Sequence, residues 1–197
     1  FLGHINCADL HRLPGAEELP SSGLLAFFGD HDSVTGCMFT GCGGAVFHWP
    51  DIDRLAPAAP AIEPLMVLPL CALALRPLTD LPDPYSGVAQ EILTDQKLVA
   101  RYSAVCKAMR HHGISEELAP DCGFGKLLGW PGLVRQDDLD TLRDAATDFR
   151  LLLQLDPYSN GEEHEGWGPG GSLYFLMRNN DLRKRRFDRC EFDMQFT

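Results

Sequence analysis

The sequence has no apolar run long enough to cross a lipid bilayer. Its longest apolar stretch, residues 62–75, is interrupted by Glu63, Pro64 and Pro69, whereas a spanning helix needs roughly 20 consecutive apolar residues. The chain also lacks a basic N-terminal region followed by an apolar segment and a small-residue cleavage site, the pattern typical of a secretory signal. These absences argue against a membrane protein and predict a cytoplasmic one.

Positive charge is scarce as well. The chain has 17 Lys and Arg residues against 28 Asp and Glu residues, which gives a formal net charge of −11. Affinity for a nucleic-acid backbone depends on clustered Lys and Arg, so we expect no nucleic-acid partner and no membrane partner, whereas a basic protein would suit this charge. The basic run at residues 183–186 lies between Asp181 and Asp188, and we interpret it as the solvated tip of a hairpin.

The number of cysteines is odd, so they cannot all pair with one another in disulfides. There are seven of them, and Cys7, Cys71, Cys106 and Cys190 lie within or beside apolar runs, where free thiols behave as small hydrophobic side chains. Without a secretory signal, this pattern predicts a reduced protein with no disulfide framework.

A metal site is the next possibility that the residues raise. His4, Cys7 and His11, together with Cys37 and Cys42, could supply nitrogen and sulfur ligands. A structural zinc site uses four such ligands, usually in two tight pairs, and His4 falls instead within a strand-like run. We therefore expect no metal ion and no other cofactor.

Two ends of the chain carry the same pattern. Apolar runs that close on Asn or Asp occupy residues 1–6 and 151–156, and runs led by Gly and rich in aromatic residues follow at 23–28 and 171–176. A further aromatic stretch follows in each case, at residues 45–49 and 192–196. Three matching segments in the same order predict an internal duplication with copies at about 1–50 and 126–197.

The segment between the copies predicts helices. Apolar residues at mostly three- and four-residue steps indicate one long helix over residues 88–109, with Ser86 as its cap and Gly113 as its stop. We expect a short amphipathic helix that starts near Asp137 or Asp138, with apolar residues at positions 139, 142, 146 and 149. The predicted class is therefore α+β, with internally duplicated antiparallel sheets and one long and one short helix between them. In the long helix, the residues expected to face the core are Ile92, Val99, Cys106 and Met109.

The motifs of both copies resemble those of the YwqG-like family of bacterial proteins. The resemblance is carried by the runs at residues 1–6 and 23–28, by their counterparts at 151–156 and 171–176, and by a Lys-Leu-x-Gly-x-Pro element at 126–132. The chain departs from the family pattern in having His4 where Gln is usual, Pro169 where an acidic residue is usual, and no Gly-Gly-x-Pro element before its first strand. The resemblance implies an α+β fold with pseudo-symmetry, no established activity, and a single domain over residues 1–197 that lacks its N-terminal segment, so that an equivalent Gly-x-Pro element is expected upstream.

No set of residues predicts a catalytic mechanism. Large aromatic side chains at strand ends, and the polar residues that occupy matching positions in the two copies, are the candidates for ligand binding. We expect a binding protein that acts through protein–protein interaction, such as the neutralisation of a toxin. The alternative is a hydrolase or a small-ligand-binding enzyme that uses a cleft between the copies. The candidate residues are Trp49, Trp130, Trp167, Tyr174, His4 and Gln154.

Overall fold

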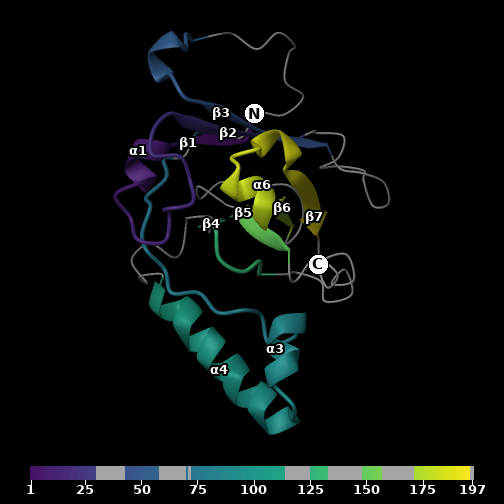
Figure 1. Cartoon of the computed structure of the whole chain (residues 1–197). Coiled ribbons are helices and arrows are strands. Elements are labelled where there is room, and N and C mark those ends of the chain that lie inside the picture. Colours follow the sequence, from purple (N-terminus) through teal and green to yellow (C-terminus); the bar gives the residue numbers. More distant parts are fainter. Residues whose placement is uncertain are drawn as a thin grey trace.

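Two antiparallel sheets organise the chain, and in each one the strands follow one another in space as they do in the sequence (Figure 1). The computed structural model describes residues 1–29, 43–57, 70, 72–113, 125–132, 148–156 and 171–195. The first sheet consists of β1 (Gly3–Asn6), β2 (Leu24–Gly29) and β3 (Gly44–Trp49). The second consists of β4 (Gly125–Leu127), β5 (Phe149–Leu155), β6 (Ser172–Arg178) and β7 (Glu191–Gln195).

Helices connect and flank the sheets, so the α+β class predicted from the sequence is confirmed. Among the described residues, no helix has the length and apolar character needed to cross a membrane. The helices are α1 (Cys7–Leu10), α3 (Gly87–Ile92), α4 (Gln96–Gly113) and α6 (Asn179–Arg183), with 3-10 turns η1 (Ile52–Arg54) and η2 (Phe187–Arg189).

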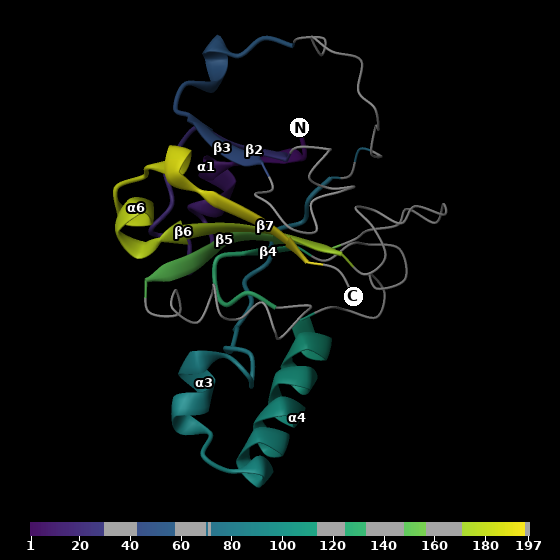
Figure 2. The same cartoon turned by 90° about the vertical axis from the view of Figure 1, so that its right-hand side faces the viewer.

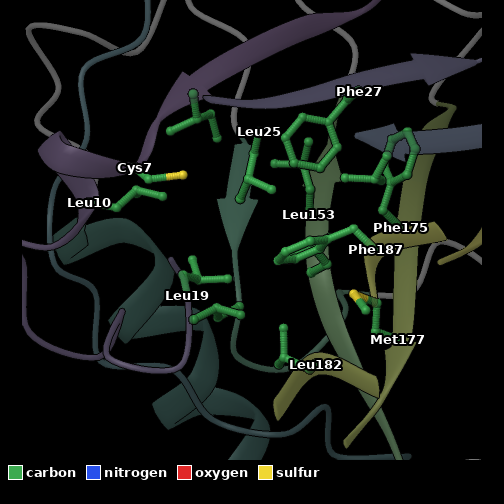
Figure 3. Close-up of a cluster of buried hydrophobic side chains, with 14 of the residues drawn as sticks. Cys7, Leu10, Leu19, Leu25, Phe27, Leu153, Phe175, Met177, Leu182 and Phe187 are labelled. Atoms are coloured by element: carbon green, nitrogen blue, oxygen red, sulfur yellow. The ribbon is translucent and has the colours of Figure 1, made fainter. Parts of the chain in front are cut away.

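The hydrophobic core lies between the two sheets. Side chains from the facing strands point toward one another in Figure 3, and the rings of Phe27 on β2 and Phe175 on β6 meet edge to face with centroids 5.2 Å apart. Helix α1 adds Cys7 and Leu10 to the same cluster, which Leu182 of α6 also joins. Because fully burying one such apolar side chain contributes about 1.5–3 kcal/mol, this shared core holds the sheets together.

A bulge in β5 gives the second sheet apolar side chains on both faces. Leu151 pairs with Leu176 and Leu153 pairs with Phe175, and the register shifts between these pairs. The shift places Leu151 in a cluster with Tyr174 and Leu176, whereas Leu153 belongs to the core between the sheets. The neighbouring strand β6 is buried from Ser172 to Met177, which means that both of its faces are covered.

The two sheets use the same register in their matching strand pairs. His4 lies opposite Ala26 in the first sheet, and Gln154 lies opposite Tyr174 in the second. Leu25 and Phe27 in the first sheet, and their expected counterparts Leu173 and Phe175 in the second, are all at most 1% exposed. The duplication of the two halves as whole units stays a prediction.

The prediction that residues 88–109 are mainly helical is confirmed, but the structure divides them between two helices instead of one. Ser86 caps α3 as expected, since its Oγ accepts the N–H of Ala89 at 3.3 Å. The carboxylate of Asp95 then accepts the N–H groups of Lys97 and Leu98 at 2.8 and 2.9 Å, which starts α4 as a separate helix.

The two helices stand together away from the sheets in both views (Figures 1 and 2). Tyr102 donates its hydroxyl to the carbonyl of Pro82 at 2.9 Å, and Cys106 on the same face of α4 is buried. Val99 and Met109 are only partly buried, and Ile92 is 72% exposed, so the expectation that it faces a core is wrong. The short helix predicted to start near Asp137 or Asp138 lies mostly outside the described ranges. Phe149, the last of its expected apolar residues, begins β5 instead.

Candidate functional site

The outer face of the first sheet carries a continuous row of aromatic rings, which we name the aromatic face: Phe1, His4, Phe28, Phe47 and Trp49. Phe1 stacks on His4 with ring centroids 5.8 Å apart and contacts Phe28 at 5.4 Å. Phe28 meets Phe47 at 5.6 Å, and Phe47 stacks on Trp49 at 6.1 Å. The rings therefore support one another across all three strands.

Strand alternation explains why these rings point away from the core. Successive side chains of a strand point to opposite faces, and on β3 Val46 is 2% exposed whereas Phe47 is 48% and Trp49 44% exposed. Phe1, beyond the start of β1, is 69% exposed. The strands β1, β2 and β3 contain no Lys, Arg, Asp or Glu, so the aromatic face combines apolar character with an absence of charge on its own strands.

The matching face of the second sheet is covered. Leu151, Tyr174 and Leu176 point to that face and are at most 7% exposed. The hydroxyl of Tyr174 donates to the carbonyl oxygen of Gly132 at 2.8 Å, which places the loop that follows β4 against this sheet. The two sheets thus differ in what lies on their outer faces.

Gln154 fixes the same loop through its side-chain amide. Its Oε1 accepts the N–H of Gly132 at 2.8 Å, and its Nε2 donates to the Gly132 carbonyl at 3.3 Å and to Oδ1 of Asp156 at 2.8 Å. Ser172 donates its hydroxyl to the same Asp156 oxygen at 2.7 Å. Because buried amides are costly unless bonded and Gln154 is 4% exposed, this cluster binds the loop to the sheet.

A carboxylate from a distant segment holds the other end of the loop. Asp80 Oδ2 lies 3.1 Å from Lys126 Nζ and accepts the N–H of Trp130 at 2.7 Å. Lys126 also donates to the carbonyl of Trp130 at 2.8 Å. Gly129 has a φ of +80°, and a Cβ built on it would lie 2.6 Å from Asp80 Oδ2, so glycine is required at this position for both reasons.

The six candidate binding residues do not form one site. Trp130, Tyr174 and Gln154 meet at the loop after β4, where the amide and the hydroxyl bind the loop backbone. His4 and Trp49 lie on the aromatic face of the other sheet, and Trp167 lies outside the described residues. The sequence interpretation missed Phe47, although its alternation with Val46 on the strand is a usable signal.

Within the described ranges, no group of three or more His, Cys, Asp or Glu side chains is placed to hold a metal ion. His4 and His11 are exposed, whereas Cys7 is fully buried in the core. Cys37 and Cys42 lie outside the described residues, so the structure does not extend to the pair that the sequence favoured as zinc ligands.

A comparison with protein families matches residues 1–195 to a domain of unknown function, DUF1963. The chain belongs to the DUF1963 family. A comparison with curated proteins finds no match to it. The family match covers both sheets and all the helices of the fold described above.

Two of the described cysteines of this DUF1963 chain, Cys7 and Cys190, lie in environments that favour the neutral thiol. Cys7, Cys106 and Cys190 are free thiols. Burial raises the pKa of Cys7. Burial, with the neighbouring Glu191 carboxylate, raises the pKa of Cys190 to about 12. A nucleophilic cysteine needs a lowered pKa and partial exposure, so neither of these two has the properties of a catalytic thiol.

The basic run at residues 183–186 forms the end of α6 in the connection between β6 and β7. The N–H of Arg185 donates to the Leu182 carbonyl and that of Arg186 to the Asp181 carbonyl, each at 2.9 Å, which is the Schellman pattern of a helix end. Arg185 takes the left-handed position of that motif, with a φ of +55°. Arg186 pairs with the buried carboxylate of Asp181, and residues 183–185 are exposed.

Proposed function

We propose that this DUF1963 domain is a binding module that contacts another protein with its aromatic face. The main observation that supports this proposal is the exposure of Phe1, Phe47 and Trp49 on one side of a sheet whose other side is buried. Solvent-exposed aromatic residues gathered in one place are characteristic of interaction sites. The second sheet supports this proposal by contrast. Its outer face is covered by a loop of the same chain, so its apolar side chains there are not exposed.

Two finer proposals accompany it. The first is that the domain acts in the cytoplasm and neutralises a toxin, for which the net charge of −11 is the supporting feature. The second is that the two sheets derive from an internal duplication and that the chain is YwqG-like, which the shared register of the pairs His4–Ala26 and Gln154–Tyr174 supports.

The competing proposal is a hydrolase or a small-ligand-binding enzyme. It would need Asp, His or Glu side chains that converge on a reacting atom. The buried polar groups of Gln154 and Tyr174 bind the backbone of Gly132 instead. The geometry therefore favours the binding module.

Site-specific photo-crosslinking in the source cell tests the proposal. A photoreactive amino acid replaces Phe47 in one variant and Ile92 in the other, because Ile92 is an exposed apolar residue on α3, outside the aromatic face. We expect a discrete crosslinked protein from position 47 and none from position 92.

The captured protein is then purified and titrated against the wild-type chain and the double variant Phe47→Ser/Trp49→Ser, with Ile92→Ser as the control. Loss of binding in the double variant alone supports the proposal. A crosslinked protein that binds all three chains equally refutes it.

A further inference from the structure

The size of the aromatic face limits what can cover it. At about 200 Å² for an aromatic side chain, the exposed fractions of Phe1, Phe47 and Trp49 correspond to roughly 300 Å². A stable protein–protein interface buries about 800 Å² on each partner. The three most exposed rings therefore supply less than half of that area, which suits a short segment of a partner better than a stable dimer.

The charges near the aromatic face indicate which sign of charge the bound segment should carry. The strands of the face contribute no Lys or Arg, so they offer nothing to neutralise a phosphate backbone or an acidic peptide. Two exposed carboxylates, Asp51 and Asp53, lie two and four residues after Trp49, against one exposed cation, Arg54. The whole chain carries a net charge of −11. A second copy of the chain would bring the same negative charge and would be repelled.

The rings themselves attract cations. The face of an aromatic ring is electronegative, and a Lys or Arg side chain placed over it within about 6 Å of the centroid is stabilised. The guanidinium group of Arg is planar and also stacks on aromatic rings. Arg178 already does so elsewhere in this chain, since its guanidinium carbon lies 4.5 Å from the ring centroid of Phe149.

We propose that the aromatic face binds a short cationic segment of a partner protein, with arginine or lysine side chains stacked on Phe47 and Trp49 and paired with Asp51 and Asp53. This inference rests on the proposed function and names the chemistry of the partner. It does not involve the loop held by Gln154 and Asp80.

Calorimetric titration of the full chain with two peptides of equal length, one rich in arginine and one rich in glutamate, tests the inference. We expect only the arginine-rich peptide to bind, more weakly at high salt. Trp49→Leu keeps an apolar side chain and the net charge but removes the ring, so affinity should fall about five-fold. Trp49→Phe keeps a ring and should recover most of the affinity.

Equal binding of the arginine-rich peptide by the wild type and Trp49→Leu would overturn the inference, because attraction would then depend on net charge alone. Binding of the glutamate-rich peptide would overturn it too, as would a crosslink from position 47 to a second copy or to the chain itself.

The crosslinking experiment separates the two proposals. If position 47 captures a partner whose contacting segment is not basic, the cationic inference fails and the binding function stands. If position 47 captures no partner, the proposed function fails.

Discussion

Replacing Gly129 by alanine should break the contact between Asp80 and Trp130, which is one of the contacts that hold the loop after β4. The backbone φ of +80° at Gly129 costs a residue with a side chain about 1–2 kcal/mol. The new Cβ would also lie 2.6 Å from Asp80 Oδ2, so the carboxylate has to move away from the N–H of Trp130 and from Lys126. A hydrogen bond to a charged group contributes about 1.5–3 kcal/mol, so the expected total loss is about 2.5–5 kcal/mol.

Gly15→Ala is the matched control. Gly15 has a φ of +91°, and a Cβ added there meets nothing within 4 Å, so this variant bears the backbone cost alone. Urea unfolding of the full chain measures both, with an expected difference of about 1.5–3 kcal/mol between them. In an Asp80→Ala background the two glycine substitutions should cost the same, because the partner of the clash is gone. Equal losses in the wild-type background would refute the contact argument.

Three further predictions address other parts of the fold. Gln154→Leu should lower the free energy of unfolding by about 1–3 kcal/mol because it removes the acceptor of the Gly132 N–H. His4→Leu, at the matching exposed position, should change it by no more than about 0.5 kcal/mol. Equal effects in urea unfolding would contradict the difference between the two sheets. Arg185→Gly should raise the free energy of unfolding by about 0.5–1 kcal/mol, because glycine suits the left-handed position. Arg183→Gly in α6 should lower it by about 1 kcal/mol. Thermal melting measures both, and a loss of stability in both variants would contradict the Schellman assignment. Cys190 should react with iodoacetamide far more slowly in the folded chain than in urea at pH 8, measured by peptide mass spectrometry, because its pKa is raised to about 12; equal rates would contradict this environment. Since the raised pKa favours the thiol in the folded state, its contribution to stability is lost as pH rises from the ordinary value of 9.0 toward 12.

The sequence predicted local structure where a local signal exists. Apolar runs gave the positions of β1, β2, β5 and β6, and the α+β class followed from the order of strands and helices. Ser86 was recognisable as a cap because a hydroxyl residue preceding an apolar-periodic segment has that role. Asp95 has the same capping chemistry, but the apolar periodicity continues across it, and so the break between α3 and α4 was missed.

Contacts between segments that are distant in the sequence have no such local signal. Asp80 lies 50 residues before Trp130, to whose N–H it is bonded, and no spacing rule joins them. Ile92 fits the helical period of its neighbours, but a period identifies only a face and not whether anything packs against that face. Its 72% exposure therefore depends on the arrangement of the helices in space.

The exposure of the aromatic face could not be predicted from the sequence for the same reason. Alternation predicts that Phe47 and Trp49 point opposite to Val46, and the shared register predicts that His4 and Gln154 lie on corresponding outer faces. Whether an outer face is covered depends on other segments: in the second sheet Gln154 and Tyr174 bind a loop of the chain, whereas in the first the rings stay exposed. Two sheets with the same strand pattern can thus share one core and still differ in whether the outer face is covered.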